Sequence, residues 1–474
     1  MKKIKRGEEL YNIQVESIAA EGKAIAKIDG QVLFISNAIP GDIVNVRVTK
    51  SRKSFMEGFI TRLVTPSPDR VEPFCDHFGL CGGCKWQHLP YPLQLKAKEQ
   101  QVEDQLGRIG GLQLPPISPI LGSERSTHYR NKLEFTFSSR RWIEDLAAEG
   151  ELTPNERVGL GFHIAGHFDK VLDIKECHLQ PEPSNAIRLF IKGYALDNNL
   201  EFFDLKRQEG LLRTIVVRTT SIGEVMVIVV FAKEMKRERE ALLAALEREF
   251  PSITSLNWII NEKQNDSIAD LPSYNWSGNS HIFEEMEGLR FRIAPKSFFQ
   301  TNSAQAYNLY KIVREMASLK GNEVLYDLYT GAGTIALFLA SKAQKVVGIE
   351  YVEEAVADAK INAELNGISN STFIAGDMRK ILTPQFIEEH GHPHIIVLDP
   401  PRAGIHPDVA KVIAECAPQK IIYVSCNPAT QARDTALMVD NYNIVKVQPV
   451  DMFPHTHHLE NVLLLEKKSY EKSF

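Results

Sequence analysis

A regular alternation of strand-like and helical segments dominates the chain from about residue 280 onward. This pattern is typical of an α/β fold with a parallel, doubly wound sheet. Open sheets of this kind bind their ligands beyond the carboxyl ends of the strands, so residues that directly follow strands are the first candidates for function. The candidate strands lie at 324–329, 345–350, 371–374, 394–398, 420–424, 444–450 and 461–466, and helical stretches separate the first five.

Two other patterns precede this sheet, because 474 residues are too many for a single core. Residues 8–65 hold short alternating runs between turn signals, which predicts a small N-terminal β-barrel over 1–66. Residues 67–275 mix strand-like runs with helices and predict a central α+β domain. Its helix at 91–109 is amphipathic and could pack on the last domain. The doubly wound domain is then expected over 276–474.

The net charge of −5 is unevenly distributed along the chain. The first 66 residues carry 11 Lys and Arg against 7 Asp and Glu, whereas the remainder is at −9. A basic N-terminal part favours a polyanionic partner, although a solvated surface would also explain it. No apolar run approaches the roughly 18 residues of a membrane span, and the start lacks a signal-peptide core. A cytoplasmic protein without membrane contact is therefore expected.

A thiol and a carboxylate follow two of the candidate strands. Cys426 lies in Ser425-Cys426-Asn427-Pro428, after an apolar run at 421–424. Asp399 opens Asp399-Pro400-Pro401-Arg402, after another such run at 395–398. Together with a glycine loop at 327–333, they indicate covalent chemistry beside a bound cofactor at one sheet edge. The alternative is that Cys426 is a small buried hydrophobe, as many free cysteines are.

The glycine loop predicts an adenosine-type cofactor. Gly331 and Gly333 would let a ligand approach the backbone closely. Glu350 ends the next strand, 23 residues after Asp327, where an acid can hold ribose hydroxyls. Asp377, after the third strand, could address the adenine edge. A dinucleotide is possible, but the loop is shorter than G-x-G-x-x-G, so S-adenosylmethionine (SAM) fits better.

Four of the six cysteines indicate a metal centre. Cys75, Cys81 and Cys84 form C-x5-C-x2-C around Gly82-Gly83, and Cys177 lies farther along. In a cytosolic chain this pattern favours metal ligation over disulfides. Zinc and an iron–sulfur cluster both accept four thiolates, and three close ligands with one distant ligand favour a 4Fe–4S cluster. Unrelated free thiols are the alternative.

At this point the chain closely resembles the RNA uracil-5-methyltransferases, above all the iron–sulfur 23S rRNA enzymes with a TRAM domain. The resemblance covers nearly the whole length. It is carried by residues 1–66, by the four cysteines, and by Tyr129-Arg130-Asn131-Lys132, Ser297-Phe298-Phe299-Gln300-Thr301-Asn302, Asp327-Leu328-Tyr329, Asp399-Pro400-Pro401-Arg402, Ser425-Cys426-Asn427-Pro428 and His455-Thr456-His457-His458-Leu459-Glu460.

The resemblance implies a SAM-dependent methyltransferase fold for the last domain, with SAM and a 4Fe–4S cluster as cofactors. It implies RNA as the partner, with 23S rRNA favoured over transfer RNA, and no obligate protein partner is evident. It implies that Cys426 is the nucleophile and Glu460 the base. The residues that it places around SAM and uracil are Gln300, Tyr329, Glu350, Asp377 and Asp399.

The chemistry of these groups fits that activity. Carbon 5 of uracil becomes nucleophilic when a thiolate adds to carbon 6, and a helix that starts near residue 429 is expected to help ionise Cys426. Glu460 would then remove the carbon-5 proton. Phe298 could stack on a splayed base, and Arg130 and Lys132 could hold phosphates. The alternatives are that Phe298 packs in the core and that Arg130 and Lys132 lie on a solvated strand edge.

Other functions explain fewer of these residues. A cytosine-5 enzyme often places its thiol after proline, where this chain has Arg402. Methylation of an amino group needs no nucleophile. A non-catalytic iron–sulfur RNA-binding protein would need neither Cys426 nor Glu460, and an electron-transfer protein would not need the glycine loop.

Overall fold

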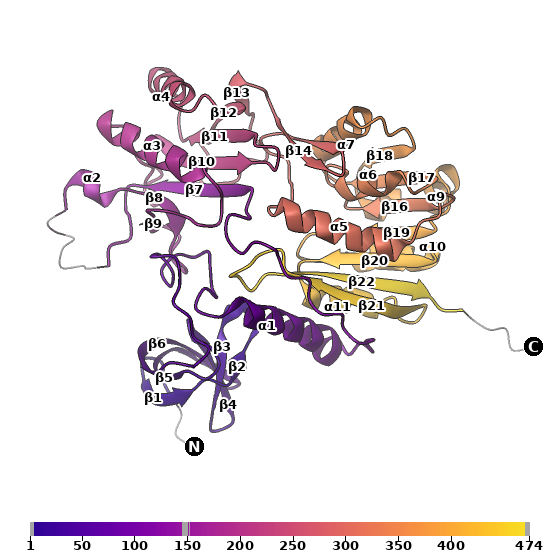
Figure 1. Ribbon diagram of the computed structural model, residues 1–474, viewed down its shortest axis with the longest axis horizontal. Coiled ribbons are helices and arrows are strands. Elements are labelled where there is room, and N and C mark those ends of the chain that lie inside the picture. Colours follow the sequence, from indigo (N-terminus) through magenta and orange to yellow (C-terminus); the bar gives the residue numbers. More distant parts are fainter. Residues whose placement is uncertain (1–3, 145–149, 151, 470–474) are drawn as a thin grey trace, which may run out of the picture.

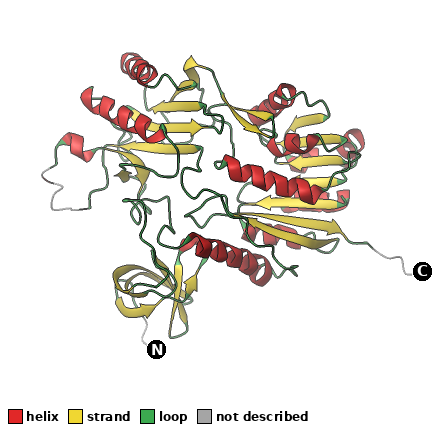
Figure 2. Cartoon of the chain, viewed as in Figure 1, coloured by secondary structure: helices red, strands yellow, loops and turns green. Residues whose placement is uncertain are grey.

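The computed structural model describes residues 4–144, 150 and 152–469, so the outermost residues of the expected first and last domains lie outside the described chain. Three sheet-containing parts surround a common centre (Figure 1). Loops, rather than helices or strands, occupy the place where the three parts meet (Figure 2). No helix in the described part of the chain is long and apolar enough to cross a membrane.

The N-terminal part is a six-stranded sheet in the order β1-β5-β6-β4-β3-β2. Alternate side chains of β5, such as Val44 and Val46, are fully buried in its own core, as the alternating pattern predicts. The hydrogen-bonded order ends at β1 and β2, so closure into a barrel stays a prediction. The elements are β1 (Glu9–Gln14), β2 (Ser17–Ile18), the short η1 (Ala20–Gly22), β3 (Ala24–Ile28), β4 (Gln31–Ser36), β5 (Ile43–Ser51) and β6 (Phe55–Thr65).

A cysteine-bearing loop then leads into α1 (Tyr91–Glu103), which continues as the π-helical turn η2 (Asp104–Ile109). Pro92 stands in the first turn of α1, where the missing amide proton costs nothing. Val102 and Leu106 are fully buried against the C-terminal part, because η2 packs on α11 and α1 packs on β21.

The central part is a seven-stranded sheet in the order β13-β12-β11-β10-β7-β8-β9, in which only β11 and β12 run parallel. The apolar run 225–231 forms β11 and is buried on both faces. Its Val227 and Val229 face a core under α3 and α4, whereas Met226 and Ile228 share a core with the C-terminal part. The elements are β7 (Lys132–Ser138), α2 (Pro154–Arg157), β8 (Gly159–His163), β9 (Val171–Asp173), α3 (Ser184–Asp197), β10 (Leu212–Thr219), β11 (Val225–Phe231), α4 (Lys236–Glu249), β12 (Ser255–Ile260) and β13 (Tyr274–Gly278).

The C-terminal part confirms the predicted α/β fold, with strand order β18-β17-β16-β19-β20-β22-β21. Helices cover both faces of this sheet (Figure 1). The elements are the hairpin β14 (Ile282–Met286) and β15 (Leu289–Ile293), then α5 (Ser303–Ala317), β16 (Val324–Leu328), α6 (Thr334–Ala340), β17 (Lys345–Glu350), α7 (Glu353–Leu365), β18 (Ser371–Ala375), α8 (Met378–Ile381), α9 (Pro384–His390), β19 (Ile395–Leu398), α10 (Pro407–Cys416), β20 (Lys420–Ser425), α11 (Pro428–Ala436), β21 (Tyr442–Val450) and β22 (Glu460–Lys467).

The prediction of a wholly parallel sheet was wrong for the last strand. The first five strands are parallel, but β22 pairs antiparallel with both β20 and β21. Residues 451–459 are the only link between β21 and β22, and they contain no helix that could carry the chain back across the sheet. A parallel connection needs such a crossover, so the two strands form a hairpin instead.

The glycine loop yields a stability prediction. Gly333 has φ +78°, and a Cβ built there would lie 3.0 Å from Ala359 Cβ. Gly331 has φ +56° but no atom within 4 Å of a built Cβ. Gly331→Ala should therefore cost only the strain of a left-handed residue, about 1–2 kcal/mol. Gly333→Ala adds overpacking of about 1–3 kcal/mol, and should show a lower thermal unfolding midpoint than Gly331→Ala. Equal midpoints would contradict this packing argument.

Candidate active site

Four reactive side chains converge on one edge of the C-terminal sheet. Asp327 lies near the carboxyl end of β16, Asp399 directly follows β19, and Cys426 directly follows β20. Glu460 is the first residue of β22, which enters the same edge from the opposite direction. Because Ser425 pairs with Asn461, the neighbouring Cys426 and Glu460 come together. The predicted thiol and carboxylates therefore share one corner of the sheet.

Buried hydrogen bonds fix this corner. Gln431 of α11 donates from Nε2 to the carbonyl oxygens of Tyr423 (2.7 Å) and Asn461 (3.1 Å). Asn461 donates back from Nδ2 to Gln431 Oε1 at 2.8 Å. Gln431 and Asn461 are fully buried, so water does not compete for these hydrogen bonds. They lock α11, β20 and β22 together next to the reactive groups.

The thiol of Cys426 is not ionised in this arrangement. Burial raises its pKa to about 11, and the charges of Glu460 and then Asp399 add to the effect, against an opposing contribution from Arg402. Helix α11 does begin at Pro428, directly after the Asn427 cap. Its N-terminal dipole nevertheless does not outweigh burial and two carboxylates, so the expected ionising effect is not the dominant one.

The two carboxyls beside Cys426 also favour their protonated forms. Burial, and then the charge of Asp327, raises the pKa of Asp399 to about 7. Burial and then the charge of Asp399 raise the pKa of Glu460 well above its ordinary value. Glu460 Oε2 is buried without a hydrogen-bond partner in the described chain. Such a group can accept a proton only when something else in the site favours its charged form.

The glycine loop forms a strained cradle between β16 and α6. Tyr329 has φ +66°, and the amide of Gly331 donates to Glu350 Oε2 at 3.1 Å. Glu350 also accepts from the amides of Tyr351 (2.7 Å) and Val352 (3.0 Å). Open space lies beyond Gly331, so the backbone there is accessible to a ligand.

Asp377, which is expected to address an adenine edge, forms an ion pair in the structure. It caps α8, and its carboxylate accepts from the Arg379 guanidinium, with one oxygen at 2.6 Å. The Arg379 hydrogen bonds lower the pKa of Asp377 to about 2. A ligand would have to compete with this ion pair, which sequence spacing alone did not reveal.

The remaining predicted residues lie on the side of the site that faces the central part. Gln300 is 7% exposed, and its carbonyl accepts from Asn131 Nδ2 at 2.8 Å, which joins the 300–303 turn to the start of β7. Phe298, two residues earlier, is 73% exposed. Arg130 lies over the ring of Phe453 at 5.5 Å. The exposure of Phe298 rules out the core-packing alternative for that ring.

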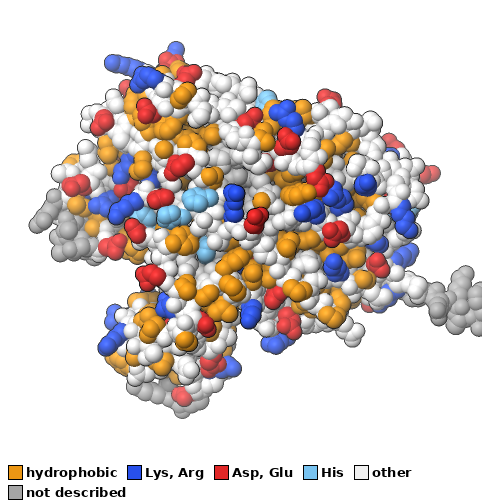
Figure 3. Space-filling model, viewed as in Figure 1, with side chains coloured by type: hydrophobic (Ala, Val, Ile, Leu, Met, Phe, Trp, Pro, Cys, Tyr) orange, Lys and Arg blue, Asp and Glu red, His pale blue; other side chains and the backbone are white. Residues whose placement is uncertain are grey.

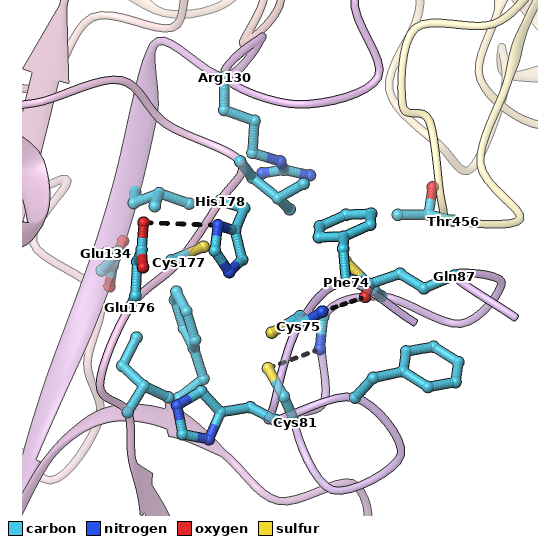
Figure 4. Close-up of a pocket in the computed structure, with 18 of the residues that line it drawn as sticks. Phe74, Cys75, Cys81, Gln87, Arg130, Glu134, Glu176, Cys177, His178 and Thr456 are labelled. Carbon is cyan, nitrogen blue, oxygen red and sulfur yellow. Dashed lines mark hydrogen bonds and ion pairs between the residues drawn. The ribbon is translucent and has the colours of Figure 1, made fainter. Parts of the chain in front are cut away.

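The four predicted cysteine ligands line one cavity of about 390 Å³ (Figure 4). Its wall also contains Arg130 and Lys132. Burial raises the pKa of Cys84 to about 12 and that of Cys177 to about 11, and the pKa values of Cys75 and Cys81 shift in the same direction. Cys416, on α10, is buried away from this cavity.

These cysteines do not converge on a single point. No group of three or more His, Cys, Asp or Glu side chains in the described chain is placed to hold a metal ion. The three histidines before Glu460 also form no such group. Burial lowers the pKa of His455, His457 and His458 to about 4 each, so they are neutral at physiological pH.

Sequence reasoning missed two features of the site. Arg402 counters the raised pKa of Cys426, and its carbonyl accepts from Asn427 Nδ2 and Thr430 Oγ1 at 3.3 Å each. Its position directly after Asp399-Pro400-Pro401 was the available signal. The other feature is a fully buried ion pair between Lys98 and Asp451, 353 residues apart in the chain, for which the sequence carries no local signal.

Comparison with known proteins assigns this arrangement to a family. The family described as tRNA (Uracil-5-)-methyltransferase matches residues 211–468, and the TRAM domain matches residues 5–60. An "Uncharacterized RNA methyltransferase" of Porphyromonas gingivalis is 55% identical over 96% of this chain and 100% of its own. One of the same description from Bacteroides thetaiotaomicron is 53% identical over 95% of this chain and 100% of its own.

A solved structure shares the whole architecture. The Pyrococcus abyssi tRNA (uracil-54, C5)-methyltransferase, crystallised with S-adenosyl-L-homocysteine, has a TM-score of 0.75 and 27% sequence identity. The match covers 96% of this chain and 100% of that one. The chain therefore belongs to the tRNA (uracil-5-)-methyltransferase family, carries a TRAM domain, and is an RNA methyltransferase.

Proposed function

We propose that this protein transfers a methyl group from SAM to carbon 5 of a uridine in 23S rRNA through a covalent bond between Cys426 and the base. The observation that carries the proposal is the meeting of Cys426 and Glu460 at the sheet edge, where the charge of Glu460 acts directly on the thiol. Transfer of a methyl group to carbon 5 needs both a nucleophile and a separate proton acceptor. Binding alone needs neither.

The glycine loop supports a SAM site at the same edge. Its backbone is open beyond Gly331, and the buried Asp327 Oδ1 has no hydrogen-bond partner in the described chain. When bound, SAM supplies an electrophilic methyl group. The residues that we propose for the SAM and uracil sites are Gln300, Tyr329, Gly331, Gly333, Glu350, Asp377 and Asp399.

The raised pKa values describe how the chain's own groups would work. Cys426 starts as a thiol, and its proton passes to the Asp399 carboxylate, which is partly ionised near pH 7, as the sulfur attacks carbon 6 of the base. The electron pair of the carbon 5–carbon 6 bond moves into an enolate, so that carbon 5 can take the methyl group. Ionised Glu460 then removes the carbon-5 proton, the double bond re-forms, and the sulfur leaves.

RNA contacts are proposed for the face between the central part and the site. Lys, Arg and His side chains lie among Asp and Glu side chains over the region of β7, β8 and β9 (Figure 3). Arg130 and Lys132 stand at the start of β7, where they could bind phosphates, and exposed Phe298 offers a ring for base stacking. The TRAM domain would add its own RNA contacts, and we expect the reaction to take place in the cytoplasm without an obligate protein partner.

Two variants test the covalent mechanism. Cys426→Ala should lose turnover completely and keep SAM affinity, because the thiol forms a bond only to the base. Glu460→Gln should accumulate a protein–RNA adduct that carries the methyl group, because release requires removal of the carbon-5 proton. Denaturing gels with labelled SAM and RNA measure both outcomes, and Cys416→Ala is the matched cysteine control. Free protein alone in the Glu460→Gln lane would refute the role of Glu460.

We also propose that Cys75, Cys81, Cys84 and Cys177 hold a 4Fe–4S cluster. The donor set supports this, because four thiols line one cavity. A single zinc ion needs its thiolates within about 2.3 Å of one point, an arrangement that the described side chains do not have. A four-iron cluster occupies more of a cavity and holds its ligands farther apart. The cluster would require ionised thiolates and would therefore have to overcome the effect of burial, which raises the pKa of all four thiols.

Protein purified without oxygen should therefore be brown, with visible absorption and with iron and sulfide in equal amounts. Cys84→Ser should lose the colour, and Cys416→Ser should keep it. A colourless wild-type protein that contains zinc would overturn the cluster proposal without affecting the roles of Cys426 and Glu460.

Transfer RNA is the second candidate substrate. The matched family and the Pyrococcus abyssi structure are both named for tRNA, and that structure aligns over 96% of this chain. Against it stands the cysteine set, which by resemblance favours the ribosomal enzymes.

Mapping of 5-methyluridine in RNA from a strain that lacks this protein decides between the two substrates. We expect one or more sites in 23S rRNA to lose the methyl group while tRNA is unchanged, and restored methylation when the gene is returned. Loss confined to tRNA would assign the enzyme to tRNA and refute the ribosomal target.

A further inference from the structure

The loop of residues 451–459 joins β21 to β22 and ends directly before Glu460. Segments that are distant in the sequence hold this loop by hydrogen bonds. Tyr129 of the central part donates its hydroxyl to the carbonyl of Pro454 at 3.1 Å. The amides of Lys85 and Trp86, directly after Cys84, donate to the carbonyl of His455 at 2.7 and 3.1 Å. Helix α1 makes further contacts with the loop, above all through Gln94 and Lys98, which lie one helical turn apart.

The first of these contacts is the Lys98–Asp451 ion pair. Lys98 Nζ donates to Asp451 Oδ1 at 2.5 Å and to the carbonyl of Phe453 at 3.1 Å. Asp451 also accepts from the Tyr91 hydroxyl at 2.8 Å and from the amide of Phe453 at 3.0 Å. Both charged side chains are fully buried. The ammonium group thus binds the loop at two points that are two residues apart.

The second contact is a pair of bonds between Gln94 and His455. Gln94 Oε1 accepts from the His455 amide at 2.9 Å, and Gln94 Nε2 lies 3.2 Å from His455 Nδ1. Gln94 Nε2 also donates to the backbone carbonyls of Trp86 (2.9 Å) and Leu89 (2.8 Å). Gln94 is fully buried, so a single side chain ties α1, the cysteine-bearing segment and the loop together.

These contacts hold His455 in a strained backbone conformation. Its φ of +64° lies in the left-handed region, which a side chain with a Cβ adopts only when the surroundings enforce it. The enforcing contacts are two hydrogen bonds at its carbonyl, one hydrogen bond at its amide, and the contact of its ring with Gln94. Without them, the loop would relax toward an unstrained backbone. Glu460, at the far end of the loop, pairs directly with Val450 at its start, so a shift of Asp451 reaches the carboxylate.

We propose that Gln94 and the Lys98–Asp451 pair are positioning residues for the reaction, which hold the 451–459 loop so that Glu460 faces the base bound at Cys426. This inference rests on the proposed function, since it assigns no new chemistry to the site. It predicts that loss of the Gln94 or Lys98 contacts with the loop slows the proton-removal step and leaves the binding of RNA and SAM intact. A residue that served only to stabilise the fold would not select one step of the reaction.

The experiment compares Gln94→Glu and Lys98→Met with matched controls on exposed positions of the same helix, Gln100→Glu and Lys96→Met. Gln94→Glu keeps the acceptor for the His455 amide but removes the NH2 group that donates to the Trp86 and Leu89 carbonyls and lies beside His455 Nδ1. For each folded protein, kcat, RNA affinity from filter binding and SAM affinity from calorimetry are measured. The amount of methylated protein–RNA adduct is read from denaturing gels.

We expect kcat to fall about tenfold or more in both loop-contact variants, because small misplacements of reacting groups have effects of this size. RNA and SAM affinities should change by less than about twofold, and the methylated adduct should accumulate as in Glu460→Gln. The controls should match the wild type. A kcat within about twofold of wild type, or an equal loss of affinity, would overturn the proposal.

Loss of one buried charge could prevent Lys98→Met from folding. The double variant Lys98→Met/Asp451→Asn removes both charges and keeps one acceptor oxygen for the Phe453 amide, with its side-chain NH2 group facing the Tyr91 hydroxyl. It lacks the Lys98 bond to the Phe453 carbonyl. It should fold and still show the low kcat, whereas a wild-type kcat would overturn the proposal. If Glu460→Gln gives no adduct, the proposed role of Glu460 fails, while the split between kcat and affinity still tests positioning.

Discussion

The antiparallel pairing of β22 with β20 is the constraint on which the candidate site depends. It sets Asn461 opposite Ser425, and so brings Glu460 beside Cys426 although the two are 34 residues apart. A parallel strand in the same place would begin at the opposite edge of the sheet and deliver its first residue far from the thiol. The mutual bonds of Gln431 and Asn461 then prevent this register from slipping.

Burial of this corner has a common electrostatic consequence. It raises the pKa of the thiol and of both neighbouring carboxyls, so all three groups ionise less readily than they would in water. For the proposed reaction, this means that charge must appear one group at a time, when the base and the cofactor complete the site. Arg402, which opposes the shift at Cys426, is the cation in position to favour an ionised sulfur.

The sequence was most informative about candidate site residues that directly follow a strand. Cys426 and Asp399 directly follow apolar runs, and parallel strands bring such positions to one edge. Contacts between distant segments could not be predicted in this way. The Lys98–Asp451 pair joins α1 to the last hairpin, and neither segment carries a sequence signal that identifies the other as its partner. The spacing that suggested a ligand role for Asp377 was equally compatible with the Arg379 ion pair that the structure contains.

The continuous apolar run of β11 illustrates the same limit and has a mechanical consequence. Met226 and Ile228 belong to the core of the C-terminal part, while Val227 and Val229 belong to the core beneath α3 and α4. One strand thus serves as the shared wall of two hydrophobic interiors. A hinge between these two parts would expose that wall to water, so they must move as a single block. The N-terminal sheet has a separate core of its own, so a movement of that part would leave the shared wall covered.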